Sequence, residues 1–139
     1  MEELKDKQVI VNFGHPLSPK LKDEIEAIIN REIDERHFNV GINMKKNIYI
    51  QCIDIINRVN VPDLPADYVV NLPGLPIAAY YLCVELEART EQKPSILELH
   101  REKDEKGVMS DFRFGRIRSM EVEYRFSAEK YYKNEQNNI

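Results

Sequence analysis

Apolar residues in this chain of 139 residues follow two patterns, short runs with little interruption and longer stretches with helical spacing. The apolar runs at 8–13 and 68–72 are typical of strands buried on both faces of a sheet. Partial alternation at 37–42 favours a more exposed second strand, although Gly41 weakens that prediction. Alternation at 95–101 predicts a fourth strand.

Helical spacing appears between these runs, and each predicted helix has a start or stop signal. Ser18 is a good N-cap with Pro19 in the first turn. The second helix starts near Asn47 and ends before the prolines at 62 and 65, and the third follows Pro73-Gly74-Leu75-Pro76. The apolar positions expected to face the core are Leu21, Ile25, Ile28 and Ile29 in the first helix, Ile48, Cys52, Ile55, Ile56 and Val59 in the second, and Ile77, Tyr81, Val84 and Ala88 in the third.

The alternation of strands with helices predicts an α/β fold, with a Rossmann-like, mostly parallel sheet flanked by helices. After a charged turn at 102–107, two-residue alternation at 112–118 and 120–126 predicts a C-terminal edge strand or hairpin, antiparallel in the sheet or pairing across a partner subunit. We expect one domain over 1–130, followed by a polar tail at 131–139 that is disordered.

Composition narrows the classes of function. The formal net charge of −4 argues against binding to long nucleic acid, which relies on many cationic side chains. No apolar segment approaches the roughly 20 residues of a membrane span, and no signal-peptide core is seen, so we predict a cytoplasmic protein without a membrane partner. Cys52 and Cys83 have no second ligand at metal-site spacing, so we expect no metal and two buried thiols.

Two strand-to-helix loops are nearly copies of each other. Asn12-Phe13-Gly14 and Asn71-Leu72-Pro73-Gly74 each end an apolar strand with asparagine and then supply glycine, and a proline starts the helix that follows. Helix N-termini beside such loops favour a phosphate and ribose site, with the asparagine amides contacting a ligand. The alternative is that these residues only satisfy turn geometry. No dinucleotide or Walker A glycine motif occurs, so no cofactor is predicted.

Three further features allow both a functional and a structural interpretation. His15 lies in the first loop, where an imidazole suits phosphate contact or proton transfer, yet a loop histidine bonded to backbone is the commoner case. Of Tyr80 and Tyr81, one ring is expected in the core and the other near the crevice or a subunit contact. The cations Arg113, Arg116 and Arg118 suit a polyanion or a subunit contact, or else protect an exposed edge strand.

The segments Asn12-Phe13-Gly14-His15-Pro16-Leu17-Ser18-Pro19 and Val70-Asn71-Leu72-Pro73-Gly74-Leu75 resemble the small single-domain ancillary proteins encoded beside type III CRISPR systems. Those proteins are related in fold to CARF (CRISPR-associated Rossmann fold) sensor domains. The resemblance runs from about Val9 to Arg101, and the part of the chain after Gly107 lies outside the pattern.

The resemblance implies a homodimer that binds cyclic oligoadenylate, most simply the four-adenylate ring, across the dimer axis. It implies that the ring contacts Asn12, Gly14, His15, Ser18, Asn71, Pro73 and Gly74, with Phe13 and Leu72 beside them. We consider three functions, of which the resemblance implies the first two and the third is an independent alternative. The first is sequestration of the second messenger, which lowers its free concentration. The second is a metal-independent ring nuclease in which a ribose 2′-OH attacks the adjacent phosphate and His15 is the candidate catalytic residue. The third is a protein-interaction module without a nucleotide ligand.

Overall fold

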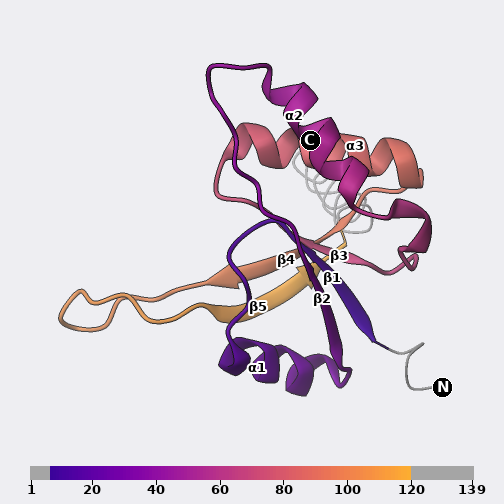
Figure 1. Cartoon of the computed structure of the whole chain (residues 1–139). Helices are drawn as coiled ribbons and strands as arrows, with labels where there is room; N and C mark the ends of the chain where they lie inside the picture. The colour runs from indigo at the N-terminus through magenta and orange to yellow at the C-terminus, as the bar shows by residue number, and fades with distance from the viewer. Residues whose placement is uncertain (1–6, 120–139) are drawn as a thin grey trace, which may run out of the picture.

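A five-stranded mixed sheet forms the middle layer of the structure, a computed structural model that describes residues 7–119. The strand order is β2-β1-β3-β4-β5. Four strands run parallel and β5 is antiparallel to β4 at one edge, which confirms the predicted α/β class (Figure 1). The bounds of the strands are β1 (Gln8–Asn12), β2 (Ile33–His37), β3 (Val69–Asn71), β4 (Ser95–His100) and β5 (Arg113–Arg118).

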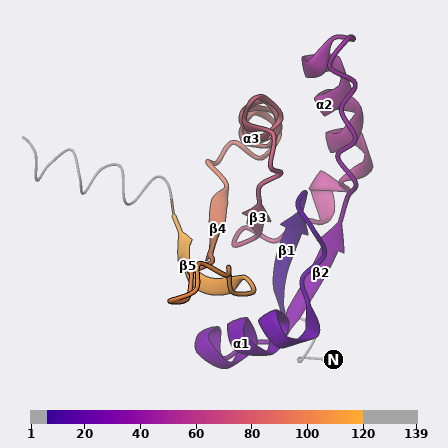
Figure 2. The same ribbon diagram turned by 90° about the vertical axis from the view of Figure 1, so that its left-hand side faces the viewer.

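Helices cover both faces of this sheet (Figure 2). One face is covered by α1 (Pro19–Ile29), which packs on a cluster that includes Ile10, Val69 and Leu97. The other is covered by α2 (Ile48–Arg58) and α3 (Pro76–Thr90), with a short 3-10 turn, η2 (Val61–Asp63), before β3. Buried apolar side chains on both faces explain why β1 and β3 read as unbroken apolar runs.

The predicted start of α1 is confirmed in detail. Ser18 has an extended backbone, and its Oγ accepts a hydrogen bond from the Leu21 amide at 3.1 Å. Leu21 and Ile25 are buried as expected, and Ile29 packs at the margin of the core. Ile28 is 62% exposed, so its predicted burial is wrong. Ile28 and Ile29 lie about 100° apart around the helix and do not both face the sheet.

The second strand was predicted at 37–42 but lies at Ile33–His37, so that prediction is wrong. Backbone pairing sets the position, because β1 ends at Asn12 and the last bond between the two strands runs from the Phe38 amide to the Asn12 carbonyl at 2.9 Å. Beyond Phe38 no described strand is available as a partner. Phe38, Val40 and Ile42 instead pack on the core as an extended loop, which accounts for their alternation.

The buried face of α3 also differs from the predicted one. Ala78, Leu82 and Leu86 are fully buried, whereas Ile77 and Val84 are 37% and 38% exposed. The remaining two predicted positions are half-buried Tyr81 and exposed Ala88. This helix is apolar on more than one side, so helical spacing alone allows two solutions. Small Ala78 permits close approach of α2, whose Cys52 Sγ lies 3.9 Å from the Ala78 carbonyl oxygen.

Strands β4 and β5 continue past the end of β3, and residues 101–112 between them form a long hairpin arm. Figure 1 shows this arm extending away from the body of the molecule. The predicted charged turn lies in the arm, where residues 101–112 are all exposed. The predicted alternation at 120–126 and the predicted tail at 131–139 lie outside the described residues.

Candidate functional site

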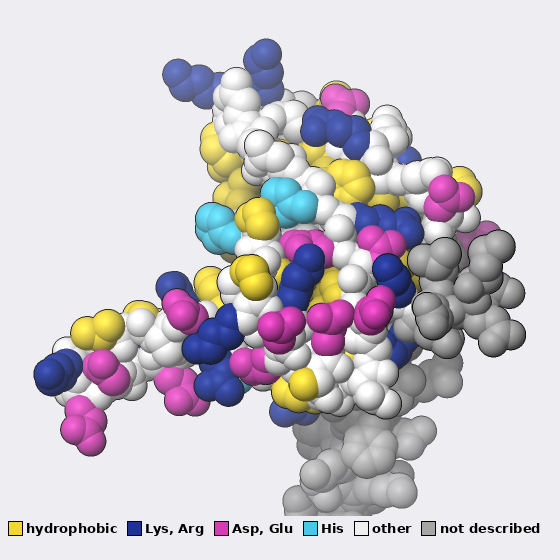
Figure 3. Space-filling model, turned by 60° about the horizontal axis from the view of Figure 1, so that its bottom comes forward, with side chains coloured by type: hydrophobic (Ala, Val, Ile, Leu, Met, Phe, Trp, Pro, Cys, Tyr) yellow, Lys and Arg dark blue, Asp and Glu magenta, His cyan; other side chains and the backbone are white. Residues whose placement is uncertain are grey.

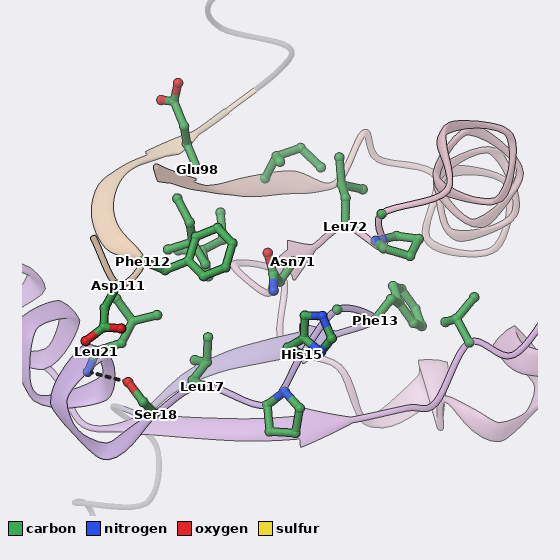
Figure 4. Close-up of a pocket in the computed structure, with 18 of the residues that line it drawn as sticks. Phe13, His15, Leu17, Ser18, Leu21, Asn71, Leu72, Glu98, Asp111 and Phe112 are labelled. Atoms are coloured by element: carbon green, nitrogen blue, oxygen red, sulfur yellow. Dashed lines mark hydrogen bonds between the residues drawn. The ribbon is translucent and has the colours of Figure 1, made fainter. Parts of the chain in front are cut away.

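A crevice of about 1070 Å³ opens at the carboxyl ends of β1, β3 and β4. It lies where the strand order reverses between β1 and β3, which is the usual ligand position in open α/β sheets. Figure 4 shows side chains from both predicted loops facing this space. The lining includes eight of the nine predicted ligand-binding residues, namely Phe13, Gly14, His15, Ser18, Asn71, Leu72, Pro73 and Gly74.

The ninth predicted residue, Asn12, lies beneath the crevice and is fully buried. Its Nδ2 donates to the His15 carbonyl and to Glu35 Oε2, both at 2.8 Å. Its Oδ1 accepts from the Gly14 amide at 2.8 Å and from Asn71 Nδ2 at 2.9 Å. Instead of the ligand contact predicted for it, Asn12 joins both loops from below, since each polar atom of its amide is engaged within the protein.

The two glycines in the predicted loops have different surroundings. A Cβ built on Gly14 would lie 3.0 Å from Asn71 Nδ2 and 3.1 Å from the Leu72 carbonyl oxygen, whereas one built on Gly74 has no neighbour within 4 Å. The close approach of the two loops therefore favours glycine at position 14, since a larger residue would push Asn71 or the Leu72 backbone aside. Gly74 lies in open space at the crevice wall.

Glu35 is a supporting residue that the sequence analysis missed. Its Oε2 accepts from Asn12 Nδ2 and from the Leu17 amide, and its Oε1 lies 3.5 Å from Lys22 Nζ. Its side chain is 10% exposed. The misplaced second strand concealed it, because a strand at 33–37 puts Glu35 two positions before the carboxyl end of β2, beside the first loop.

The two histidines near the first loop have different environments. His37 Nε2 lies 2.7 Å from the Gly14 carbonyl oxygen and so supports the loop from the end of β2. His15 is exposed at the crevice, and no residue within 7–119 bonds its ring. The alternative predicted for His15, a ring bonded to nearby backbone, is therefore not found within residues 7–119, whereas His37 at the end of β2 makes a bond of that kind.

Charged side chains at the crevice are mixed in sign. Lys20, Arg118, Glu98 and Asp111 all line it. Glu98 pairs with Arg118 at 3.0 Å and with Arg116 at 3.3 Å. The hydrogen bond from Arg118 is the main reason that the pKa of Glu98 is below its usual value. On the face drawn in Figure 3, acidic and basic side chains are likewise interspersed.

The arginines of β5 are engaged by carboxylates of the same chain. Arg113 Nε lies 2.8 Å from Glu24 Oε2 on α1, while Arg116 and Arg118 share Glu98 on β4. Of the three, only Arg118 lines the crevice. These pairs fit the prediction of an edge strand protected by charge, because they neutralise the cations that were also considered for a polyanion contact.

The two cysteines lie away from the crevice, in the helix layer. Cys52 is buried and Cys83 is half-buried, and burial raises the pKa of Cys83 to about 11. In the range 7–119, no group of three or more His, Cys, Asp or Glu side chains is arranged to hold a metal ion. None of the helices in that range has the length and apolar character of a membrane span.

The tyrosine pair on α3, Tyr80 and Tyr81, lies outside the lining of the crevice. Tyr81 is half-buried, and the centre of its ring lies 5.1 Å from the centre of the Tyr49 ring. Tyr80 is 64% exposed. Tyr81 packs against the core without being fully buried, so the prediction of one ring in the core is met only in part. Neither ring lines the crevice, so that alternative for the second ring is wrong, and a subunit contact for it stays a prediction.

Comparison with known proteins gives no further assignment: no protein-family model matches this chain, and no significant match was found among curated proteins or solved structures.

Proposed function

We propose that this chain binds cyclic tetra-adenylate between two copies of itself and holds it without rapid cleavage, which lowers the free concentration of a second messenger of type III CRISPR signalling. The observation that carries the proposal is the crevice of about 1070 Å³ at the β1/β3 reversal, with both predicted loops in its lining. The family resemblance of those loops supplies the ligand class.

The size and chemistry of the crevice support a ligand larger than a mononucleotide. Small-molecule pockets usually hold about 300–1,000 Å³, and the crevice volume of about 1070 Å³ lies just above that range. Apolar side chains such as Leu17, Leu72 and Phe112 suit the faces of bases. Lys20 also lines the crevice and adds a cation for a phosphate.

The arrangement favours holding over cutting. General acid–base catalysis is favoured when a partner orients the catalytic group, and no residue within the described range bonds the ring of His15. The carboxylate nearest to the loop, Glu35, is bonded to Asn12 and Leu17. Cleavage by a ribose 2′-OH needs only in-line positioning, so the ring nuclease is retained as the second candidate.

Incubation of the purified protein with radiolabelled cyclic tetra-adenylate tests the proposal directly. We expect retention of intact ring and, with Lys20→Glu, a dissociation constant raised about 10-fold or more by repulsion of phosphate. Lys46→Glu makes the same charge change on an exposed loop outside the crevice and should leave affinity unchanged.

Other outcomes separate the alternatives. Linear product that accumulates at catalytic rates would support the ring nuclease, and its loss in His15→Ala would assign the histidine. Absence of any retention would overturn the nucleotide function and leave the protein-interaction module.

A further inference from the structure

The asparagines that end β1 and β3 are neighbours in the sheet, and their side chains are linked. Asn12 and Asn71 are paired in register, and the Phe13 amide donates to the Asn71 carbonyl at 2.9 Å. Asn71 Nδ2 donates to Asn12 Oδ1 at 2.9 Å. The amide of Asn71 is therefore held at the floor of the crevice by a buried residue that the ligand does not reach.

The chemistry of the partners fixes the orientation of Asn12. The Glu35 carboxylate and the His15 carbonyl only accept hydrogen bonds, so the atom of Asn12 that faces them must be the donor Nδ2. The Gly14 backbone amide only donates, so the other atom must be the acceptor Oδ1. A flipped Asn12 would lose all three of these bonds.

The orientation of Asn71 follows from that of Asn12. Only a donor can face Asn12 Oδ1, so Nδ2 of Asn71 points down and its Oδ1 points away, as Figure 4 shows for the labelled side chain. No hydrogen bond within residues 7–119 reaches Asn71 Oδ1. Glu35 and the Gly14 amide fix the orientation of Asn12, and Asn12 fixes that of Asn71. As a result, Asn71 presents a hydrogen-bond acceptor, Oδ1, at the floor of the crevice.

We propose that Asn71 Oδ1 reads a hydrogen-bond donor of the ligand and that Asn12 and Glu35 are positioning residues that fix its polarity. This inference rests on the proposed function for its ligand. The group that Asn71 recognises is a neutral N–H or O–H donor. Cyclic tetra-adenylate has two such donors in each nucleotide, the exocyclic amine of the base and the 2′-hydroxyl of the ribose. The two sources are separated by experiment.

The experiment compares the affinities of three rings for the wild-type protein by calorimetry. The first ring is cyclic tetra-adenylate, the second is a ring of four purine ribosides that lacks the amine, and the third is a ring of four 2′-fluoro adenylates that lacks the hydroxyl donor. We expect one of the two analogues to bind about 10-fold or more weakly, because loss of a donor leaves Asn71 Oδ1 unpaired in a crevice. Equal affinity for all three rings overturns the inference while the proposed function stands.

Variants test the positioning role. Asn71→Leu removes the acceptor at similar volume, and its affinities for the three rings should become equal within about twofold. Glu35→Gln keeps the side-chain volume, but a glutamine can turn either its oxygen or its NH2 group toward Asn12, so the orientation of Asn12 is less firmly fixed. The ratio of affinities between the rings should therefore be smaller than in the wild type but in the same direction. A variant that weakens all rings equally and keeps the wild-type ratio would show a structural role only, which contradicts the proposal.

A readout without ligand covers the case in which no ring binds, which would overturn the proposed function. The side-chain amide protons of Asn12 and Asn71 should exchange with solvent at least about 10-fold more slowly than those of exposed Asn57, because both groups are hydrogen-bonded in the loop network. Exchange of the Asn71 amide as fast as that of Asn57 would disprove the fixed polarity on which the inference depends.

Discussion

Asn12 and Asn71 show how the same residue type takes two roles in equivalent loops. The amide of Asn12 is fully buried and makes four hydrogen bonds, whereas that of Asn71 is half-buried and donates one. A buried amide that lost a hydrogen-bond partner would lower the stability of the fold by about 1–3 kcal/mol. The role of Asn12 is therefore to stabilise the two loops. The side-chain oxygen of Asn71, Oδ1, accepts no hydrogen bond within the described residues, so it can accept one from a ligand.

At the same scale, the two loop glycines give a prediction with an internal control. Gly14→Ala forces Asn71 or the Leu72 backbone to move, because the new Cβ would lie 3.0 Å and 3.1 Å from their atoms. We expect a loss of about 1–3 kcal/mol in the free energy of unfolding, measured by urea denaturation. Gly74→Ala meets no neighbour and its backbone is not in the left-handed region, so its stability should be unchanged or rise by about 0.4–1 kcal/mol. Equal effects of both substitutions would contradict the close loop contact.

At the scale of elements, Glu24 ties helix α1 to the edge strand β5. Its carboxylate accepts from the Phe114 amide at 3.0 Å and from Arg113 Nε at 2.8 Å. The bond from Phe114 is the main cause of a pKa below the ordinary value of 4.5, and Arg113 adds to it. The charged carboxylate therefore stabilises the fold above about pH 4.5, and this contribution is lost as the pH falls from that value through the lowered pKa of the folded state.

Glu24→Gln tests this link through the pH dependence of stability. The wild type should have the higher urea midpoint at pH 7, and the difference between the two proteins should shrink as the pH falls below about 4.5. Asp54→Asn also removes one negative charge, from an exposed side chain of α2 that makes no ion pair within the described residues, and serves as the control. A difference between wild type and Glu24→Gln that stays constant with pH would exclude the charge as its source.

The elements that the sequence predicted well are those with local signals. The start of α1 follows from Ser18-Pro19, and β1 and β3 follow from apolar runs, so each was located within about one residue. Nothing local marks β2, whose charged residues are held by pairing with β1, a contact made between distant parts of the chain. The buried face of α3 was missed for the same reason, since the packing of α2 and the sheet chooses between its two apolar sides.

For the candidate site, the sequence predicted the two loops but not the residues that support them. Both loops carry visible signals in asparagine, glycine and proline, so their position at the crevice was found. Glu35 gave no signal, because its role depends on the register of β2 against β1. The burial of Asn12 was also hidden, since the sequence does not tell which of two equivalent asparagines lies beneath the other.

The charge of the whole molecule works against a polyanionic ligand. The formal net charge is −4, and the arginines of β5 are paired with Glu24 and Glu98. Long-range attraction therefore contributes little to the capture of a ring with four phosphates. Under the proposed function, affinity for the ring must therefore come from short-range contacts inside the crevice, namely base packing and Lys20.

A weak dependence of affinity on salt follows from this charge distribution. If Lys20 from each of two copies neutralises one phosphate, the logarithm of the binding constant should fall with the logarithm of salt concentration at a slope of roughly 1.4. Affinity would then drop about sevenfold between about 50 and about 200 mM sodium chloride, as measured by calorimetry. Lys20→Gln should flatten the slope to near zero, whereas Lys46→Gln should preserve it. A slope above about 3 in the wild type would require more cationic contacts than the crevice contains within the described residues, and would place the phosphates elsewhere on the protein.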